Sequence, residues 1–177
     1  MKHLNLFTVR YLCNDPWLDN KMLQLTMCQQ HQLADKQYPV ITVNDYNDIN
    51  VFKDSAEFLF IQTAGDYVVD RDYVWELLHN IPDNVGLIGH IIWDPKDSTP
   101  HLHRQCFIIN TKALEGLQFN LHSRQFAGRK FIRSEQSMHG DYCPAWVKLS
   151  DEYGPRTPDF GTDLMSLILD NGYDVVN

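Results

Sequence analysis

The chain has 177 residues, of which 44% are hydrophobic and 21% charged, and this composition is typical of a globular domain without repeats or low-complexity segments. Its apolar runs are much shorter than the roughly 20 residues needed to cross a bilayer, and its N-terminus lacks the pattern of a secretion signal. The four cysteines form no CxxC pair, which disfavours both a zinc knuckle and a disulfide framework. We therefore expect a single soluble domain over residues 1–177, with free thiols, in the cytoplasm.

The net charge of -8 is distributed unevenly along the chain. Residues 104–133 contain six Lys or Arg residues and one Glu, so this segment carries +5 and the rest of the chain -13. Because such an acidic chain is repelled by a phosphate backbone, general binding to duplex nucleic acid is disfavoured. The basic segment suits a small phosphorylated ligand or a short stretch of nucleic acid, or else its residues only balance acidic neighbours.

The first half of the chain alternates predicted strands and helices. Strands are expected at 4–9, 39–43 and 57–62, and the last has no polar alternation, which is typical of a central strand covered on both faces. Asp15 before Pro16 predicts a helix start, because aspartate caps the first turn and proline lacks an N–H that would be unpaired there anyway. One face of this helix carries Leu18, Met22, Leu25 and Cys28. A second helix ends at Pro82, and we expect one packed face made of Val74, Leu77, Leu78 and Ile81.

The second half is less regular. Strands are expected at 85–92, 105–110 and 145–149, and a last strand at 173–176. A helix from Thr162 to the stop at Gly172 has an inward face of Leu164, Leu167 and Ile168. The loops at 93–104 and 121–142 are long for a compact domain, which favours a functional role. These elements predict a single-domain α/β fold, Rossmann-like, with a mostly parallel central sheet and helices on both faces.

Polar residues follow the predicted strands, and ligands of an open parallel α/β sheet bind beyond the carboxyl ends of its strands. The residues at these ends are Arg10, Asp45, Thr63, Asp66, His90 and Asp94. Neither a Walker loop nor a GxGxxG motif follows the first strand, which disfavours a P-loop ATPase or a dinucleotide oxidoreductase.

The order of elements resembles the glycosyltransferases with an A-type fold, which use nucleotide-sugar donors. Residues 58–66 look like the apolar strand that leads into the metal-binding Asp-x-Asp of that family, and residues 105–110 resemble its later strand beside the acceptor site. Residues 133–146, followed by Phe160 and Gly161, are similar to a segment of uncharacterised glycosyltransferase-like proteins of phages and marine bacteria. The resemblance implies a domain that binds a nucleotide sugar and transfers the sugar to an acceptor hydroxyl.

The resemblance also implies roles for individual residues. Thr63 and Gly65 stand at the two aspartate positions of Asp-x-Asp, and Asp66 keeps a carboxylate directly after them. Asp66 would hold Mn²⁺ or Mg²⁺ together with the donor diphosphate and a late ligand, His139 or Asp141. In this interpretation Arg10, Thr63 and His90 line the donor site and Asp45 binds the base or ribose. The leaving diphosphate is neutralised by Arg129, Lys130 or Arg133, and the general base is Asp94 or Asp141.

Two other functions stay open at this point. The chain is either a catalytically degraded module that sequesters a nucleotide or docks a partner, or a metal-dependent hydrolase. The hydrolase would be built from His90, Asp94, His101, His103, His139 and Asp141. Plain structural roles also fit, with Asp66 capping a turn and His90 hydrogen-bonded at a strand end. No sequence pattern specifies an oligomeric state.

Overall fold

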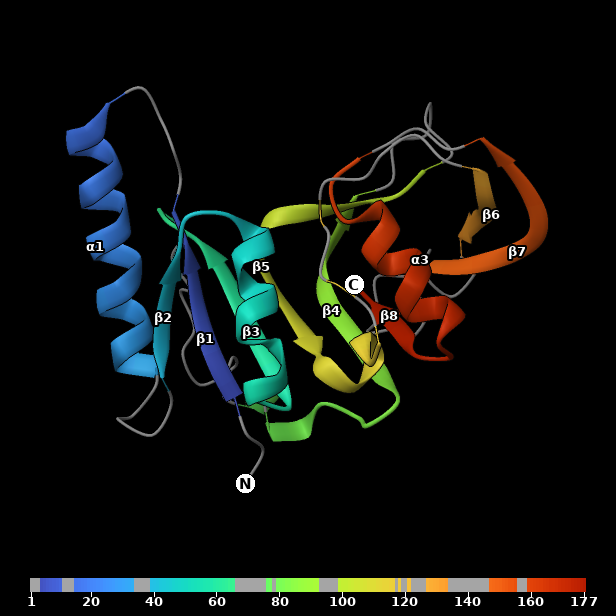
Figure 1. Ribbon diagram of the computed structural model, residues 1–177, viewed down its shortest axis with the longest axis horizontal. Coiled ribbons are helices and arrows are strands. Elements are labelled where there is room, and N and C mark those ends of the chain that lie inside the picture. Colours follow the sequence, from blue (N-terminus) through green and yellow to red (C-terminus); the bar gives the residue numbers. More distant parts are fainter. Residues whose placement is uncertain are drawn as a thin grey trace. The chain divides into compact units, whose positions relative to one another are not determined.

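The computed structural model of the chain (Figure 1) divides into two compact units. It describes residues 4–10, 15–33, 39–65, 76–77, 79–92, 99–116, 118, 121, 127–133, 147–155 and 159–177. Unit 1 comprises Met1–Pro82 and Arg104–Thr111, and unit 2 comprises Asp83–His103 and Lys112–Asn177. The boundary therefore falls within one strand, β5 (His101–Asn110).

Unit 1 is built on a sheet whose elements follow each other as β1 (Leu4–Val9), α1 (Pro16–Leu33), β2 (Val40–Val43), the 3-10 helices η1 (Tyr46–Val51) and η2 (Lys53–Ser55), and β3 (Phe58–Thr63). Strand β1 lies between β2 and β3 and is parallel to both. Strand β3 pairs on its other side with β5, which runs antiparallel to it, with Phe58 opposite Asn110.

The core of unit 1 lies on both faces of the central strands. Every residue of β1 is buried, and so are the first five residues of β3. Phe7, Leu59 and Ile61 are each 0% exposed. The prediction of a strand at 58–61 with both faces covered is confirmed, because an uninterrupted apolar run can only be buried where neither face meets water.

Helix α1 begins at Pro16 as predicted, with Asp15 as its cap. Asp15 Oδ1 accepts hydrogen bonds from the N–H groups of Trp17 and Leu18, at 2.9 and 3.2 Å. Most of the apolar stripe of the helix does not face the sheet, however, although Met22 is half-buried. Leu18 is 43% exposed, Leu25 is 50% exposed and Cys28 is also exposed.

The face of α1 that packs on the sheet is polar. Thr26 and Gln30 are 0% exposed and Gln29 is 5% exposed. They form a buried polar layer with Thr8 of β1 and Gln62 of β3, which are also 0% exposed. Figure 1 shows α1 alongside β2 and β1.

Side-chain hydrogen bonds hold the polar layer together. Gln30 Nε2 donates to the carbonyl oxygen of Phe7 at 2.9 Å, and Gln30 Oε1 accepts from the hydroxyl of Thr8. Gln62 Nε2 donates to Gln29 Oε1 at 3.3 Å. Because buried amides and hydroxyls cost free energy unless they are paired, these bonds fix the rotation of α1 about its axis.

Unit 2 contains the elements β4 (Val85–Ile92), η3 (Thr111–Leu114), β6 (Ala127–Arg133), β7 (Val147–Pro155), α3 (Thr162–Asp170) and β8 (Asp174–Val176). Strand β4 pairs in parallel with β8, and β6 pairs with β7 as an antiparallel ribbon. Helix α3 ends before Gly172 as predicted, and Gly172 has a φ of 81°. The N-cap of α3 is Gly161, however, and not Thr162 as the sequence pattern suggested, because Thr162 is the first helical residue. Leu164 and Ile168 are 0% exposed, whereas Leu167, also predicted to face inward, is half-buried.

The prediction of a mostly parallel sheet with helices on both faces is wrong. The sheet is mixed: β5 runs antiparallel to β3, and the β6–β7 ribbon is antiparallel. Among the described residues, α1 and α3 are the α-helices with defined ends, and strands predominate. The physical reason is that an apolar run is buried equally well in a parallel and in an antiparallel pair, so the sequence pattern did not specify strand direction.

Several element boundaries also differ from the prediction. Strand β5 begins at His101 rather than at residue 105, and β6 occupies part of the predicted loop 121–142. In the predicted helix before Pro82 the backbone is helical at 76–77 and 79–80, while Val74 and Leu78 lie outside the described residues. In that segment Leu77 is half-buried and Ile81 is 3% exposed. No described helix is long and apolar enough to cross a membrane.

Candidate functional site

The carboxyl ends of the three parallel strands of unit 1 are level with each other. Val9, the last residue of β1, is in register with Val43 of β2 and with Thr63 of β3. From β1 the chain continues to β2, which pairs with one edge of β1, and then to β3, which pairs with the other edge. The strand order therefore reverses between β1 and β3. Ligands of open α/β sheets bind beyond the carboxyl ends of strands at such a reversal. We call Arg10, Asp45, Tyr46, Thr63 and Gly65 the strand-end site.

Arg10 follows β1 directly, and its N–H donates to the carbonyl oxygen of Val43 at 2.9 Å. Its side chain reaches the first turns of α1, where Nη2 donates to Asn20 Oδ1 at 3.2 Å. The Nε–H of Arg10 is buried and has no hydrogen-bond partner among the described residues. A buried guanidinium N–H left without an acceptor is costly, so this group is suited to an anion.

Asp45 lies at the same edge of the sheet and is exposed. Its Oδ1 accepts from the N–H of Asn47 at 2.8 Å, and its own N–H donates to Asp48 Oδ2 at 3.0 Å. The side chain of Asp45 also accepts from the N–H of Asp48, and this bond and the bond from Asp45 N–H to Asp48 form a capping box at the start of η1. Asp45 is therefore held in place by η1, and its carboxylate lies near the carboxyl ends of the strands.

Thr63 and Tyr46 form a compact polar contact with β5. Tyr46 Oη and Thr63 Oγ1 lie 2.5 Å apart, and they lie 3.2 and 2.6 Å from the carbonyl oxygen of Arg104. The hydroxyl of Thr63 is thus engaged with the protein itself. Tyr46 is a member of the site that the sequence reasoning missed, although it follows the predicted residue Asp45 directly.

Gly65 occupies a conformation that favours glycine. Its φ is 103°, and a Cβ at this position would lie 2.8 Å from Met22 Cε. Its N–H donates to the hydroxyl of Thr26 at 2.8 Å. A side chain at position 65 would therefore be strained by the backbone, and the flexible end of Met22 would have to move aside.

A second group of polar residues lies in unit 2. His101 and His103 are two residues apart in β5, so they share one face of the strand, and His90 belongs to β4. We call these residues the histidine cluster. The rings of His90 and His103 contact each other edge to face, with centroids 5.6 Å apart and planes at 67°. His101 Nδ1 lies 3.2 Å from Asp159 Oδ2, a partner that sequence reasoning did not identify.

The imidazole of His103 is perturbed by its surroundings. His103 Nδ1 is buried and has no hydrogen-bond partner among the described residues. Burial, and then the nearby His90 and His101, lower the pKa of His103 from its ordinary value of 6.5. At neutral pH His103 is therefore an uncharged imidazole, which can donate a lone pair.

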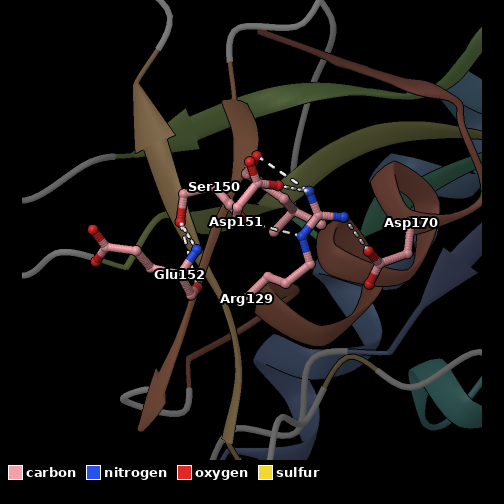
Figure 2. A network of polar contacts seen from close by, with 6 residues as sticks. Arg129, Ser150, Asp151, Glu152 and Asp170 are labelled. Atoms are coloured by element: carbon pink, nitrogen blue, oxygen red, sulfur yellow. Dashed lines mark hydrogen bonds and ion pairs between the residues drawn. The ribbon is translucent and has the colours of Figure 1, made fainter.

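The predicted phosphate-binding cations Arg129 and Lys130 of unit 2 are engaged with carboxylates, and Figure 2 shows the contacts of Arg129. Arg129 Nη1 donates to Asp170 Oδ1 at 3.0 Å, and Arg129 Nε donates to the carbonyl oxygen of Ser150 at 2.9 Å. Asp151 lies 3.8 Å from Arg129 Nη2. The ammonium of Lys130 lies 2.8 Å from Glu152, and this hydrogen bond and charge lower the pKa of Glu152. Arg129 thus connects the β6–β7 ribbon to α3.

The remaining predicted site residues lie outside the described part of the chain. They are Asp66, Asp94, His139 and Asp141, together with the side chain of Arg133. Among the described residues, no three His, Cys, Asp or Glu side chains are arranged to hold a metal ion. Thr63 is engaged with β5 and Gly65 has no side chain, so the described strand-end residues do not fit the Mn²⁺ or Mg²⁺ site implied by the resemblance.

Comparison with known proteins identifies no relative of the chain. No family model matches the sequence, and neither the curated proteins nor the solved structures include a match. Function is therefore inferred from the geometry of the strand-end site and the histidine cluster.

Proposed function

We propose that the chain is a glycosyltransferase-like protein that binds a nucleoside diphosphate sugar at the strand-end site of unit 1. The level carboxyl ends of β1, β2 and β3 support this proposal, because the strand order reverses there. The observation that carries the proposal is the buried Nε–H of Arg10, which has no acceptor among the described residues.

Arg10 is placed to bind the diphosphate. A guanidinium binds phosphate oxygens through charge-assisted hydrogen bonds, which are stronger than neutral ones. The contact of its Nη2 with Asn20 restricts the side chain before any ligand arrives, which reduces the entropy lost on binding. We assign the phosphate role to Arg10 rather than to Arg129 or Lys130, because those two cations already neutralise carboxylates of unit 2.

Asp45 is the residue that we assign to the base or the ribose. Its position at the start of η1 is fixed by the capping box, and a carboxylate accepts hydrogen bonds from ribose hydroxyls or from base N–H groups. Transfer of the sugar also needs a general base for the acceptor hydroxyl, and Asp94 and Asp141 are still the predicted candidates for it.

A module that binds the nucleotide without transferring the sugar is the second candidate. The conformation of Gly65 favours it, since the strain described there disfavours a carboxylate at this Asp-x-Asp position. For either function we propose the cytoplasm as the compartment, because Cys28 carries an exposed free thiol, which persists in a reducing environment.

The test is nucleotide binding to the full chain and to an Arg10→Gln variant. We expect uridine and guanosine diphosphates, or their sugar esters, to raise the melting temperature of the wild type by mass action. Isothermal titration should show a roughly tenfold to hundredfold weaker affinity for Arg10→Gln, since one charge-assisted contact is lost. Lys148→Gln is the matched control, because it removes the same charge from an exposed position of β7 and should bind as the wild type does.

Binding should also persist in a chelator, because the described strand-end residues provide no metal site. A wild type that no nucleotide or nucleotide sugar stabilises would refute the proposal. Equal affinities of the wild type and Arg10→Gln would refute the role of Arg10. Equal weakening by Lys148→Gln would show that only the net charge matters.

A further inference from the structure

The histidine cluster has no role in the proposed nucleotide binding, which involves residues of unit 1. His90, His101 and His103 all belong to unit 2. Two of them share one face of β5, and the third approaches them from β4. Imidazole is the most common protein ligand for transition metals. Because strands already restrict nearby histidines, such a pair loses little conformational entropy when it chelates a metal.

The spacing of His90 and His103 fits a shared metal ion. Zinc binds a histidine nitrogen at about 2.0–2.1 Å with tetrahedral angles, and this geometry places the centroids of two bound rings roughly 5 Å apart. The observed centroid distance is 5.6 Å, with the planes at 67°. The two rings are therefore about as far apart as two rings that share one ion.

His103 also has a ring nitrogen that is not hydrogen-bonded. Its Nδ1 is buried and has no hydrogen-bond partner among the described residues. An imidazole nitrogen that makes no hydrogen bond can give its lone pair to a metal ion.

We propose that His90 and His103 bind a transition-metal cation of the Zn²⁺ class. The described residues bring no third ligand close enough, so water or the oxygen atoms of a small ligand complete the coordination. With two protein ligands such a site is open, in contrast to the closed sites with four protein ligands that stabilise folds.

The experiment is a metal titration of the full chain, first stripped with a chelator and then dialysed. We expect isothermal titration to detect one high-affinity equivalent of Zn²⁺, and Co²⁺ to give the visible absorption of a complex with nitrogen ligands. His90→Asn and His103→Asn should each weaken Zn²⁺ binding at least tenfold. His31→Asn is the matched control, since His31 is an exposed histidine of α1, and it should leave the affinity unchanged.

Circular dichroism spectra of all variants establish that they are folded before they are compared. A wild type that binds no Zn²⁺ would overturn the proposal. The same holds if both cluster variants bind Zn²⁺ as the wild type does, because the metal would then be held by other residues. Since nucleotide binding is measured in chelator, failure of one proposal leaves the other intact.

Discussion

Replacing Gln30 by alanine tests whether buried hydrogen bonds, rather than apolar contacts, hold α1 on the sheet. Gln30 is 0% exposed and bonds to both Thr8 and the carbonyl oxygen of Phe7. Its truncation leaves a buried hydroxyl without a partner, at about 1–3 kcal/mol, and removes a buried methylene worth about 0.8 kcal/mol. We expect the free energy of unfolding to fall by about 2–4 kcal/mol.

Two controls on the same helix make this prediction specific. Gln24→Ala removes an identical side chain from an exposed position, and we expect a change within about 0.5 kcal/mol. Leu25→Ala removes an apolar side chain that is 50% exposed, and its cost should stay below about 1 kcal/mol. A buried leucine would cost about 2–5 kcal/mol instead.

Urea denaturation followed by far-ultraviolet circular dichroism measures all three variants. The midpoint should shift for Gln30→Ala without a change of slope, since the surface exposed on unfolding is nearly the same. A larger loss for Leu25→Ala than for Gln30→Ala would refute the reasoning. It would mean that the apolar stripe of α1, and not its polar face, packs on the sheet.

Three further predictions concern unit 2. Arg129→Met should lower the free energy of unfolding by about 1–2 kcal/mol through the lost bonds to Asp170 and Ser150, and should leave nucleotide affinity in titration calorimetry unchanged. Gly86→Ala should lower the melting temperature, at a cost of about 1–3 kcal/mol, because its Cβ would lie 2.5 Å from Ile168 Cγ2. The third prediction follows from the lowered pKa of His103 in the folded protein. Neutral His103 stabilises the fold at a pH above 6.5, the pKa in the unfolded chain, and this stabilisation is lost as the pH falls through the lower pKa of the folded state. Urea midpoints at pH 7.5 and 5.5 should therefore differ less in His103→Asn than in the wild type.

The strands of the first half of the chain could be predicted because their apolar runs have no competing interpretation. β1 and β3 are found within a residue of their predicted ends, and Asp15 caps α1 as expected. Which face of α1 packs on the sheet could not be predicted from the residues of the helix itself. It depends on Thr8 and Gln62, polar residues of two other segments whose side chains need buried partners.

Strand direction was not predictable from periodicity, since an apolar run is the same in parallel and antiparallel pairs. Strand β6 was missed for a different reason. It contains Gly128, Arg129 and Lys130, which have low strand propensity, and it is stabilised by pairing with β7 and by ion pairs with distant carboxylates.

The candidate site was predictable where it depends on strand ends alone. Arg10, Asp45 and Thr63 lie at one edge of unit 1, because each directly follows or ends a parallel strand. The contacts that give these residues their chemistry were not predictable. The bond from Thr63 to Arg104 and the ion pair of His101 with Asp159 join segments far apart in the chain, and no local pattern encodes such a pair.

The departure from Asp-x-Asp at Gly65 shows how packing constrains chemistry at this edge of the sheet. After β3 the backbone turns with a φ of 103°, and the N–H of Gly65 donates to Thr26 of α1. Met22 of the same helix fills the space that a side chain at position 65 would need. The end of the Met22 side chain is flexible and can move aside, so the backbone φ of 103° is what disfavours an aspartate at position 65. In the proposed function, the positive charge for a bound diphosphate therefore comes from a side chain such as Arg10.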